Sequence, residues 1–175
     1  MSTATATQAS QPLAVDPKLT SAIIESVENA LVMCNTTAKC VSLSTVPSGN
    51  VGLITGLIGV HGKVSGFITV NLAERMGIKM AEGLLQESFN EVNSQVVDAA
   101  GEFANIIVGG VKSGLAGSQW SFSNITVPSV IVGQGYQLTY ARGLEYLCAT
   151  FEHDDQEAVM LSDRLMNVSV SLLKL

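Results

Sequence analysis

Charge, aromatic side chains and cysteine are all scarce in this sequence. Only 14% of its 175 residues are charged and 5% are aromatic, whereas 47% are hydrophobic. The nine Lys and Arg residues form no basic cluster, and the net charge is −6. Proteins that neutralise a phosphate backbone need clustered positive charge, so nucleic acid is not an expected partner. With so few charges to cover the surface, we expect some apolar area to lie in a self-association interface.

Long apolar runs are also missing. The richest stretch, residues 51–60, is interrupted by Gly and Thr, and it falls short of the roughly 18 apolar residues that a membrane-spanning helix needs. Residues 1–15 are small, polar and uncharged, without the basic start and apolar centre of a signal peptide. We therefore expect a disordered tail over residues 1–15, no membrane partner and a cytoplasmic location.

The residues that build metal sites and hydrolase triads are too few and too scattered. Cys34, Cys40 and Cys148 are odd in number and lack C-x-x-C spacing, which favours free, buried thiols over a disulfide framework or zinc site. His61 and His153 lie far apart in the sequence, and each is expected to be solvated, since zinc needs several convergent ligands. No metal site and no cofactor of the chain's own are predicted.

The remaining residues, 16–175, have the length of one domain. Asp16 and Pro17 match the cap and first position of a helix that should run to about Met33. Residues 51–60 and 64–72 predict a β-hairpin with Gly62 at its turn. Asn71 is then expected to cap a helix.

A long central helix should follow, capped by Ser88 and Glu91 and ending between residues 115 and 117. Strands are expected at residues 122–132, 136–140 and 144–152, with Gly133 and Gly135 in a tight turn. Residues 156–165 fit either a strand or a short helix, and residues 168–172 alternate as an edge strand would. This order predicts an α/β fold of the α+β type: a two-layer sandwich of a mostly antiparallel sheet with helices on one face.

The central helix carries two sharply separated faces. At about 100° per residue, one polar stripe contains Asp98, Glu102, Asn105, Gly109 and Lys112. The opposite face is apolar and comprises Ala100, Phe103, Ala104, Ile107 and Val111. Residues 102 and 105 are neighbours on a helix surface, so their side chains can enter one partner site together.

The stripe resembles the signature of the CheX chemotaxis phosphatases, D-x-x-G-E-x-x-N-x-x-x-G-x-x-K-x-x-L. The seven matching positions are Asp98, Gly101, Glu102, Asn105, Gly109, Lys112 and Leu115. The resemblance extends over roughly residues 16–152 and implies a CheX-like fold and a homodimer that pairs through sheet strands. It also implies a partner, a phosphorylated CheY-like receiver, and an enzymatic activity, hydrolysis of the receiver's aspartyl phosphate.

Such a receiver already holds a labile aspartyl phosphate, a divalent metal (Mg²⁺) and a lysine, so the element it lacks is a placed water. In this interpretation Asn105 holds that water in line with the breaking P–O bond, and Glu102 pairs with the receiver's lysine. Glu102 and Asn105 are therefore the expected catalytic residues. Asp98, Gly109 and Lys112 are expected to bind the partner. Alternatively, Asp98 only favours the N-terminal half of the helix and Lys112 only complements the helix dipole near its C-terminus.

Other short motifs have simpler interpretations. Residues 87–90 repeat the E-x-x-N spacing, which alone is typical of a solvated helix face. Residues 109–113 resemble the end of a phosphate loop, but Val111 replaces the glycine before the lysine and Ile106 replaces the leading glycine. Residues 133–135 lack the third glycine of a dinucleotide fingerprint. On the first helix, Glu25 is followed three positions later by Glu28, with Asn29 one position too late for the second active helix of CheC proteins. Non-catalytic receiver binding, as in flagellar-switch relatives, and a structural dimerisation domain remain the alternatives.

Overall fold

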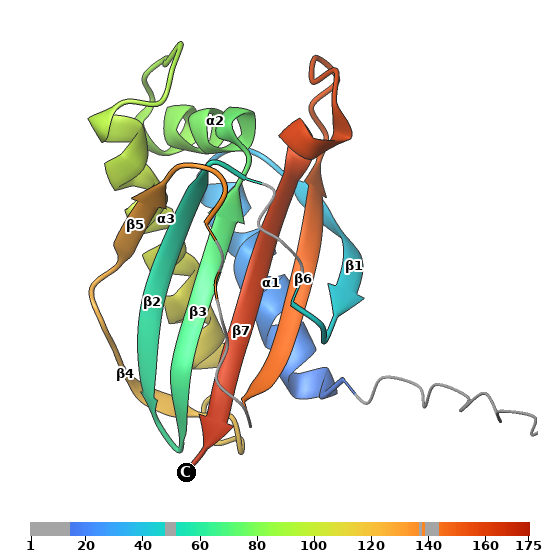
Figure 1. Cartoon of the computed structure of the whole chain (residues 1–175), viewed down its shortest axis with the longest axis vertical. Coiled ribbons are helices and arrows are strands. Elements are labelled where there is room, and N and C mark those ends of the chain that lie inside the picture. The colour runs from blue at the N-terminus through green and yellow to red at the C-terminus, as the bar shows by residue number, and fades with distance from the viewer. Residues whose placement is uncertain (1–14, 48–51, 137, 139–143) are drawn as a thin grey trace, which may run out of the picture.

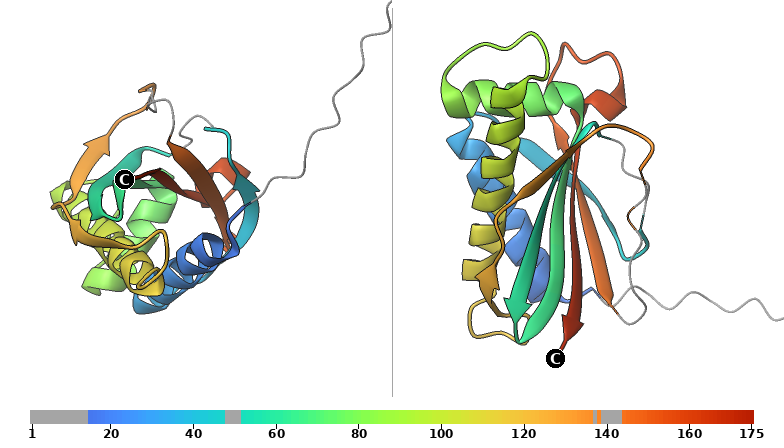
Figure 2. Two further views of the ribbon diagram at one scale, coloured as in Figure 1. Left: turned by 90° about the horizontal axis from the view of Figure 1, so that it is seen from below. Right: turned by 60° about the vertical axis from the view of Figure 1, so that its left-hand side comes forward.

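The computed structural model describes residues 15–47, 52–136, 138 and 144–175. In this part of the chain an antiparallel sheet forms one layer, and helices α1 (Pro17–Met33) and α3 (Ser94–Gly114) cover one of its faces (Figure 1). Helix α2 (Glu74–Leu85) lies across one end of the sheet, as the side view in Figure 2 shows. No helix of the described residues is both long and apolar enough to cross a membrane. The predicted two-layer α+β fold is confirmed.

The described residues contribute seven strands in the order β1-β6-β7-β3-β2-β4, and β5 also pairs with β2. All of these pairs are antiparallel. The strands are β1 (Ala38–Ser44), β2 (Ile54–Gly62), β3 (Val64–Leu72), β4 (Phe122–Ile125), β5 (Ser129–Val132), β6 (Glu145–His153) and β7 (Leu165–Lys174). A short 3₁₀ helix, η1 (Leu161–Arg164), precedes β7.

The start of α1 agrees with the sequence, but the caps predicted for the other helices were wrong. Asp16 caps α1, accepting hydrogen bonds from the backbone N–H groups of Lys18 and Leu19 at 2.9 and 3.3 Å. Asn71 does not cap α2, because it lies inside β3 and its buried side chain binds the backbone N–H and C=O of Gly52. The cap of α2 is Ala73, which forms no side-chain hydrogen bond there.

Helix α3 begins later than the proposed Ser88–Glu91 capping box. Its cap is Asn93, whose side-chain oxygen accepts a hydrogen bond from the N–H of Val96 at 3.0 Å. Residues 87–93 run in a non-helical connection before it. The predicted end of α3 is confirmed, with Leu115 as the C-terminal cap.

The hairpin of β2 and β3 is confirmed, and Gly62 lies at its turn as predicted, directly after the last cross-strand pair, His61 with Ser65. Gly62 lies within β2, and its φ is not positive. A Cβ atom at this position would come within 2.6 Å of the Cα of Phe122. Glycine is therefore required because β4 passes close by. Gly133 and Gly135, in contrast, do adopt positive φ values of 147° and 80° after β5, as a tight turn requires.

The C-terminal segment is central in the sheet, so the edge-strand prediction was wrong. Strand β7 pairs with β3 on one side and β6 on the other. Every residue of β7 from Met166 to Leu172 is buried, so the side chains on both of its faces are covered. Residues 161–164 form the short helix that was one of the two options for the preceding segment.

The hydrophobic core lies between the sheet and the two long helices. Cys34 and Cys148 are buried and Cys40 is partly buried, all as free thiols, as expected. Burial raises the pKa of the Cys34 thiol to about 11, so it is unreactive near neutral pH. The predicted tail, up to residue 14, and most of the strand expected at residues 136–140 lie outside the described residues.

Candidate functional site

The polar stripe of α3 lies on the outward side of the helix. Asp98 and Glu102 are exposed, and Asn105, Gly109 and Lys112 are half-buried. One helical turn separates the first two residues, and Asn105 follows Glu102 on the same side. The opposite face is buried throughout, with Ala100, Phe103, Ala104, Ile107 and Val111 each at most 1% exposed. Both predicted catalytic side chains therefore point away from the core.

Close packing against α1 holds one flank of α3. A Cβ atom on Gly110 would lie 2.8 Å from Oγ and 2.9 Å from Cβ of Ser26, and one on Gly114 would lie 3.0 Å from Cβ of Ala22. Ser26 itself donates a hydrogen bond to the carbonyl of Ala22 at 2.5 Å. The two glycines let the helices approach more closely than any larger residue would allow.

The connection between β4 and β5 packs against the other flank. A Cβ atom on Gly101 would lie 3.2 Å from Cγ2 of Val130 and 3.8 Å from Cβ of Pro128. Gly101 directly precedes Glu102 and lies one turn before Asn105. Its place in the signature thus has a structural reason, since a larger residue would push the β4–β5 connection away from the helix.

The described residues leave the side chains of Glu102 and Asn105 available for other contacts. Across the residues that the structure describes, neither side chain forms a hydrogen bond or an ion pair. A carboxylate and a carboxamide that are held on a rigid helix but left unpaired can make their hydrogen bonds to another molecule.

Gly109 leaves open space on the same stripe. A Cβ atom added there would meet no atom within 4 Å. Residues 109–113 belong to α3, which agrees with a helix end rather than a phosphate loop. The packing of its own chain therefore does not require glycine at position 109.

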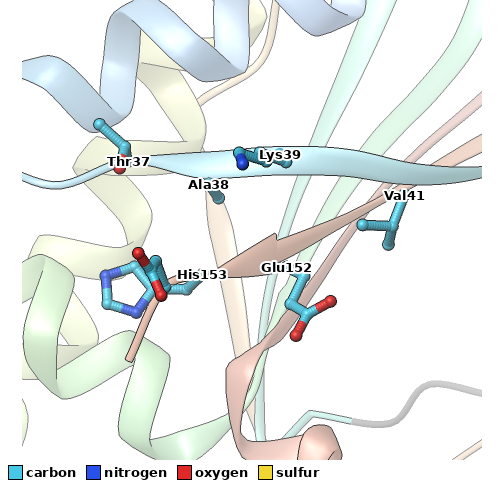
Figure 3. A pocket seen from close by; sticks show the side chains of 7 residues that line it. Thr37, Ala38, Lys39, Val41, Glu152 and His153 are labelled. Atoms are coloured by element: carbon cyan, nitrogen blue, oxygen red, sulfur yellow. The ribbon is translucent and has the colours of Figure 1, made fainter. Parts of the chain in front are cut away.

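One hollow of the surface lies at the β1 edge of the sheet. It encloses about 270 Å³ and is lined by Thr37, Lys39, Glu152 and His153, among others (Figure 3). Helix α3 instead packs over β2, β3 and β5, toward the other edge. The hollow is therefore separate from the polar stripe.

His153 differs from the sequence prediction, because it is half-buried rather than solvated. Its Nε2 forms a hydrogen bond with the hydroxyl of Thr36, and burial lowers the pKa of the ring. His61 is exposed, as expected, and its Nδ1 lies 3.1 Å from the hydroxyl of Ser65. Among the described residues no three His, Cys, Asp or Glu side chains are placed to hold a metal ion.

The second E-x-x-N sequence does not form a comparable pair. Glu87 and Asn90 lie in the non-helical connection before α3, and Glu87 accepts a hydrogen bond from Gln95 at 3.3 Å. On α1, Glu25, Glu28 and Asn29 are all exposed. In the described part of the chain, therefore, Glu102 and Asn105 form the E-x-x-N pair that lies on a helix.

Comparison with known protein families shows which family the chain belongs to. The family model described as "Chemotaxis phosphatase CheX" matches residues 54–152, more than half of the chain. The chain belongs to the CheX family. The matched region includes the hairpin of β2 and β3 and the whole of α3. No curated protein sequence matches the chain.

Solved structures of CheX-family proteins share this fold. The chemotaxis protein CheX from Vibrio vulnificus has a TM-score of 0.75 at 22% identity, covering 89% of this chain and 99% of that chain. A CheC-like superfamily protein from Shewanella has a TM-score of 0.75 at 19% identity, covering 90% and 99%. The CheX–CheY–BeF3–Mg²⁺ complex from Borrelia burgdorferi has a TM-score of 0.69 at 18% identity, covering 89% and 96%.

The sequence did not reveal that the β4–β5 connection packs beside the CheX-like stripe. The β4–β5 connection begins more than twenty residues after Gly101, and only the register of the sheet brings the two together. One signal was present: Pro128 interrupts the apolar run 122–132, and proline inside a strand indicates an edge or a bulge.

Proposed function

We propose that this protein accelerates the hydrolysis of the aspartyl phosphate of a CheY-type receiver in chemotaxis or a related two-component pathway. Membership of a family of chemotaxis phosphatases supports this function, as does the fold shared with the CheX of the Borrelia complex with CheY. The observation that carries the proposal is the pair of exposed Glu102 and half-buried Asn105 on one side of a firmly packed helix, neither with a side-chain partner among the described residues.

Asn105 positions the attacking water in this proposal. Its amide can accept a hydrogen bond from the water through its oxygen and donate one to a phosphoryl oxygen through its nitrogen. Phosphoryl transfer depends mainly on the alignment of the nucleophile and on charge stabilisation, so a placed water is enough to raise the rate. The packed helix holds the amide still while it does this.

Glu102 fixes the docked position. Its carboxylate would pair with the lysine of the receiver's phosphorylation pocket, and such charge-assisted bonds are shorter and more directional than neutral ones. Through that ion pair the carboxylate sets the angle at which Asn105 arrives. Asp98 and Lys112 would add contacts of opposite charge along the same stripe, and Gly109 would give the receiver room to approach.

The metal ion of the reaction belongs to the receiver in this proposal. A bound Mg²⁺ there neutralises charge on the phosphoryl group. The residues of this chain contribute water placement, docking and the exclusion of bulk solvent, and they bring no cofactor.

We also propose that the protein works in the cytoplasm as a homodimer. Strand β1 is an edge of the sheet, and two of its large apolar side chains, Val41 and Leu43, are 52% and 39% exposed. An exposed edge strand of this kind is a ready template for strand pairing. Light scattering of the purified full chain would give the mass of a dimer.

Release of phosphate from phosphorylated receivers tests the function. CheY-type receivers of the source organism, phosphorylated with acetyl phosphate, should lose phosphate faster when the wild-type protein is added. Asn105→Ala should lower the acceleration by about 100-fold or more, while binding of the beryllofluoride-activated receiver persists. Asn90→Ala is the matched control, because this exposed residue has the same E-x-x-N spacing outside a helix, and it should keep full activity.

Two outcomes would reject the proposed reaction. If wild type and Asn105→Ala accelerate release equally, the water does not depend on this amide. If the wild-type protein binds an activated receiver but leaves its phosphate stable, the protein is a receiver-binding module instead.

A further inference from the structure

The β4–β5 connection contains a β-bulge. Ile125 pairs with Val60 and Ser129 pairs with Leu57, so residues 126–128 lie opposite only two residues of β2. One extra residue is therefore inserted at this edge of the sheet. Bulges are common at sheet edges and beside active sites, where they redirect a side chain.

Both ends of the bulge are fixed. The N–H of Thr126 donates to the carbonyl of Gly59 at 2.9 Å, and its hydroxyl accepts from the N–H of Gly59 at 2.9 Å. On the other side Pro128 packs over Gly101 of α3. Proline also restricts the residue before it to extended backbone. The residue between these anchors, Val127, is thus held in one place.

Val127 presents an apolar side chain to solvent at this place. It is 83% exposed, although it sits between two anchored neighbours in a connection that runs beside α3 (Figure 2). Its neighbour Pro128 contacts the helix at the residue just before Glu102, on the flank that also carries Asn105. The β4–β5 connection that carries Val127 therefore borders the helix flank next to the stripe.

We propose that Val127 is a docking residue that makes an apolar contact with the receiver beside its phosphorylation pocket. This inference rests on the proposed function and names a further contact of the same site. The stripe itself offers polar and charged groups, which favour correct orientation more than affinity. A rigid apolar side chain adds affinity without a large loss of conformational freedom on binding. Val127 should therefore influence both the affinity for a receiver and the choice among receivers.

The test compares two exposed valines in steady-state dephosphorylation of the receiver that wild type serves best. Val127→Ser should raise KM about ten-fold, the range of a moderate interface contact, and leave kcat unchanged. The matched control is Val159→Ser, since Val159 is 97% exposed on the connection after β6, away from α3. Its KM and kcat should equal those of wild type. Urea midpoints of both variants should match wild type, because neither side chain is buried.

Each result has a defined meaning. Unchanged KM in Val127→Ser, or a fall in kcat at constant KM, would overturn the docking role while wild-type activity still supports the proposed function. An equal rise of KM in Val159→Ser would also overturn it, because the effect would not be specific to this site. A wild-type protein that neither binds nor dephosphorylates any receiver would refute the proposed function, and the docking role with it.

Discussion

Adjacent glycines in α3 should respond in opposite ways to the same substitution. Gly109 lies on the polar stripe, and an added Cβ would meet nothing within 4 Å. Gly110 faces α1, and an added Cβ would lie 2.8 Å from Oγ and 2.9 Å from Cβ of Ser26. The Oγ atom can rotate away, but the Cβ atom can move only with the backbone of α1. We therefore expect Gly109→Ala to stabilise the fold and Gly110→Ala to destabilise it.

The magnitudes follow from two competing effects. Replacing glycine by alanine inside a helix adds about 1 kcal/mol to the free energy of unfolding. At position 109 nothing opposes this gain, so Tm should rise by roughly 2–4 °C for a chain of this size. At position 110 overpacking costs about 1–3 kcal/mol, which leaves a net loss of about 0–2 kcal/mol. The difference between the variants is then about 1–3 kcal/mol, independent of the helix propensity that they share.

Urea unfolding followed by circular dichroism measures both free energies. If the two variants agree within about 0.5 kcal/mol, which is within the range of ordinary surface substitutions, the close approach of α1 and α3 at Ser26 is refuted.

The same proteins also test the site. Gly109→Ala should be more stable than wild type and yet have a higher KM for the phosphorylated receiver, because the methyl group occupies the space left for the partner.

The remaining predictions concern two acidic residues that join distant segments. The Arg75 guanidinium, 2.5 Å away, lowers the pKa of Asp155 from 3.8 to about 2. This contribution to stability is complete above pH 4 and is lost as the pH falls through 2, so Asp155→Asn should cost about 1 kcal/mol at pH 6. The urea midpoints of variant and wild type should converge near pH 2, and a constant difference would contradict the reasoning. Asp16→Ala removes the cap of α1 and the acceptor of the Trp120 ring N–H, 2.6 Å away. It should cost about 1–2 kcal/mol and shift the emission of Trp120, the sole tryptophan of the sequence, to longer wavelength. Asp16→Asn, which keeps a capping oxygen, should retain most of the stability, and an equal loss in both variants would contradict the capping role.

Local chemistry explains the features that the sequence predicted well. Asp16 followed by Pro17 defines the start of α1 without help from the rest of the chain. The two faces of α3 follow from helical periodicity alone, which is why all five apolar residues predicted for the buried face are buried. The CheX relationship was also readable, because the signature residues lie on one continuous element.

Long-range pairing explains the errors. Asn71 has a side chain suited to capping, but the pairing of β3 with β2 carries it to Gly52, whose backbone it binds instead. Val168 and Val170 alternate with polar residues as in an edge strand, yet β7 lies between two neighbours because β3 and β6 enclose it. Nothing in either segment itself reveals which strands will flank it.

Because one edge of the sheet is divided into β4 and β5, the proposed docking residue lies on a different element from the proposed catalytic pair. The proposed catalytic pair lies on α3, which packs closely against α1 and against the β4–β5 connection, whereas the side chain of the neighbouring Val127 is exposed and fills no part of the interior. If Val127 docks the receiver as proposed, substitutions there would alter partner choice while the proposed hydrolytic chemistry stays intact. Duplicated copies of such a gene could therefore diverge toward different signalling pathways through changes at very few codons.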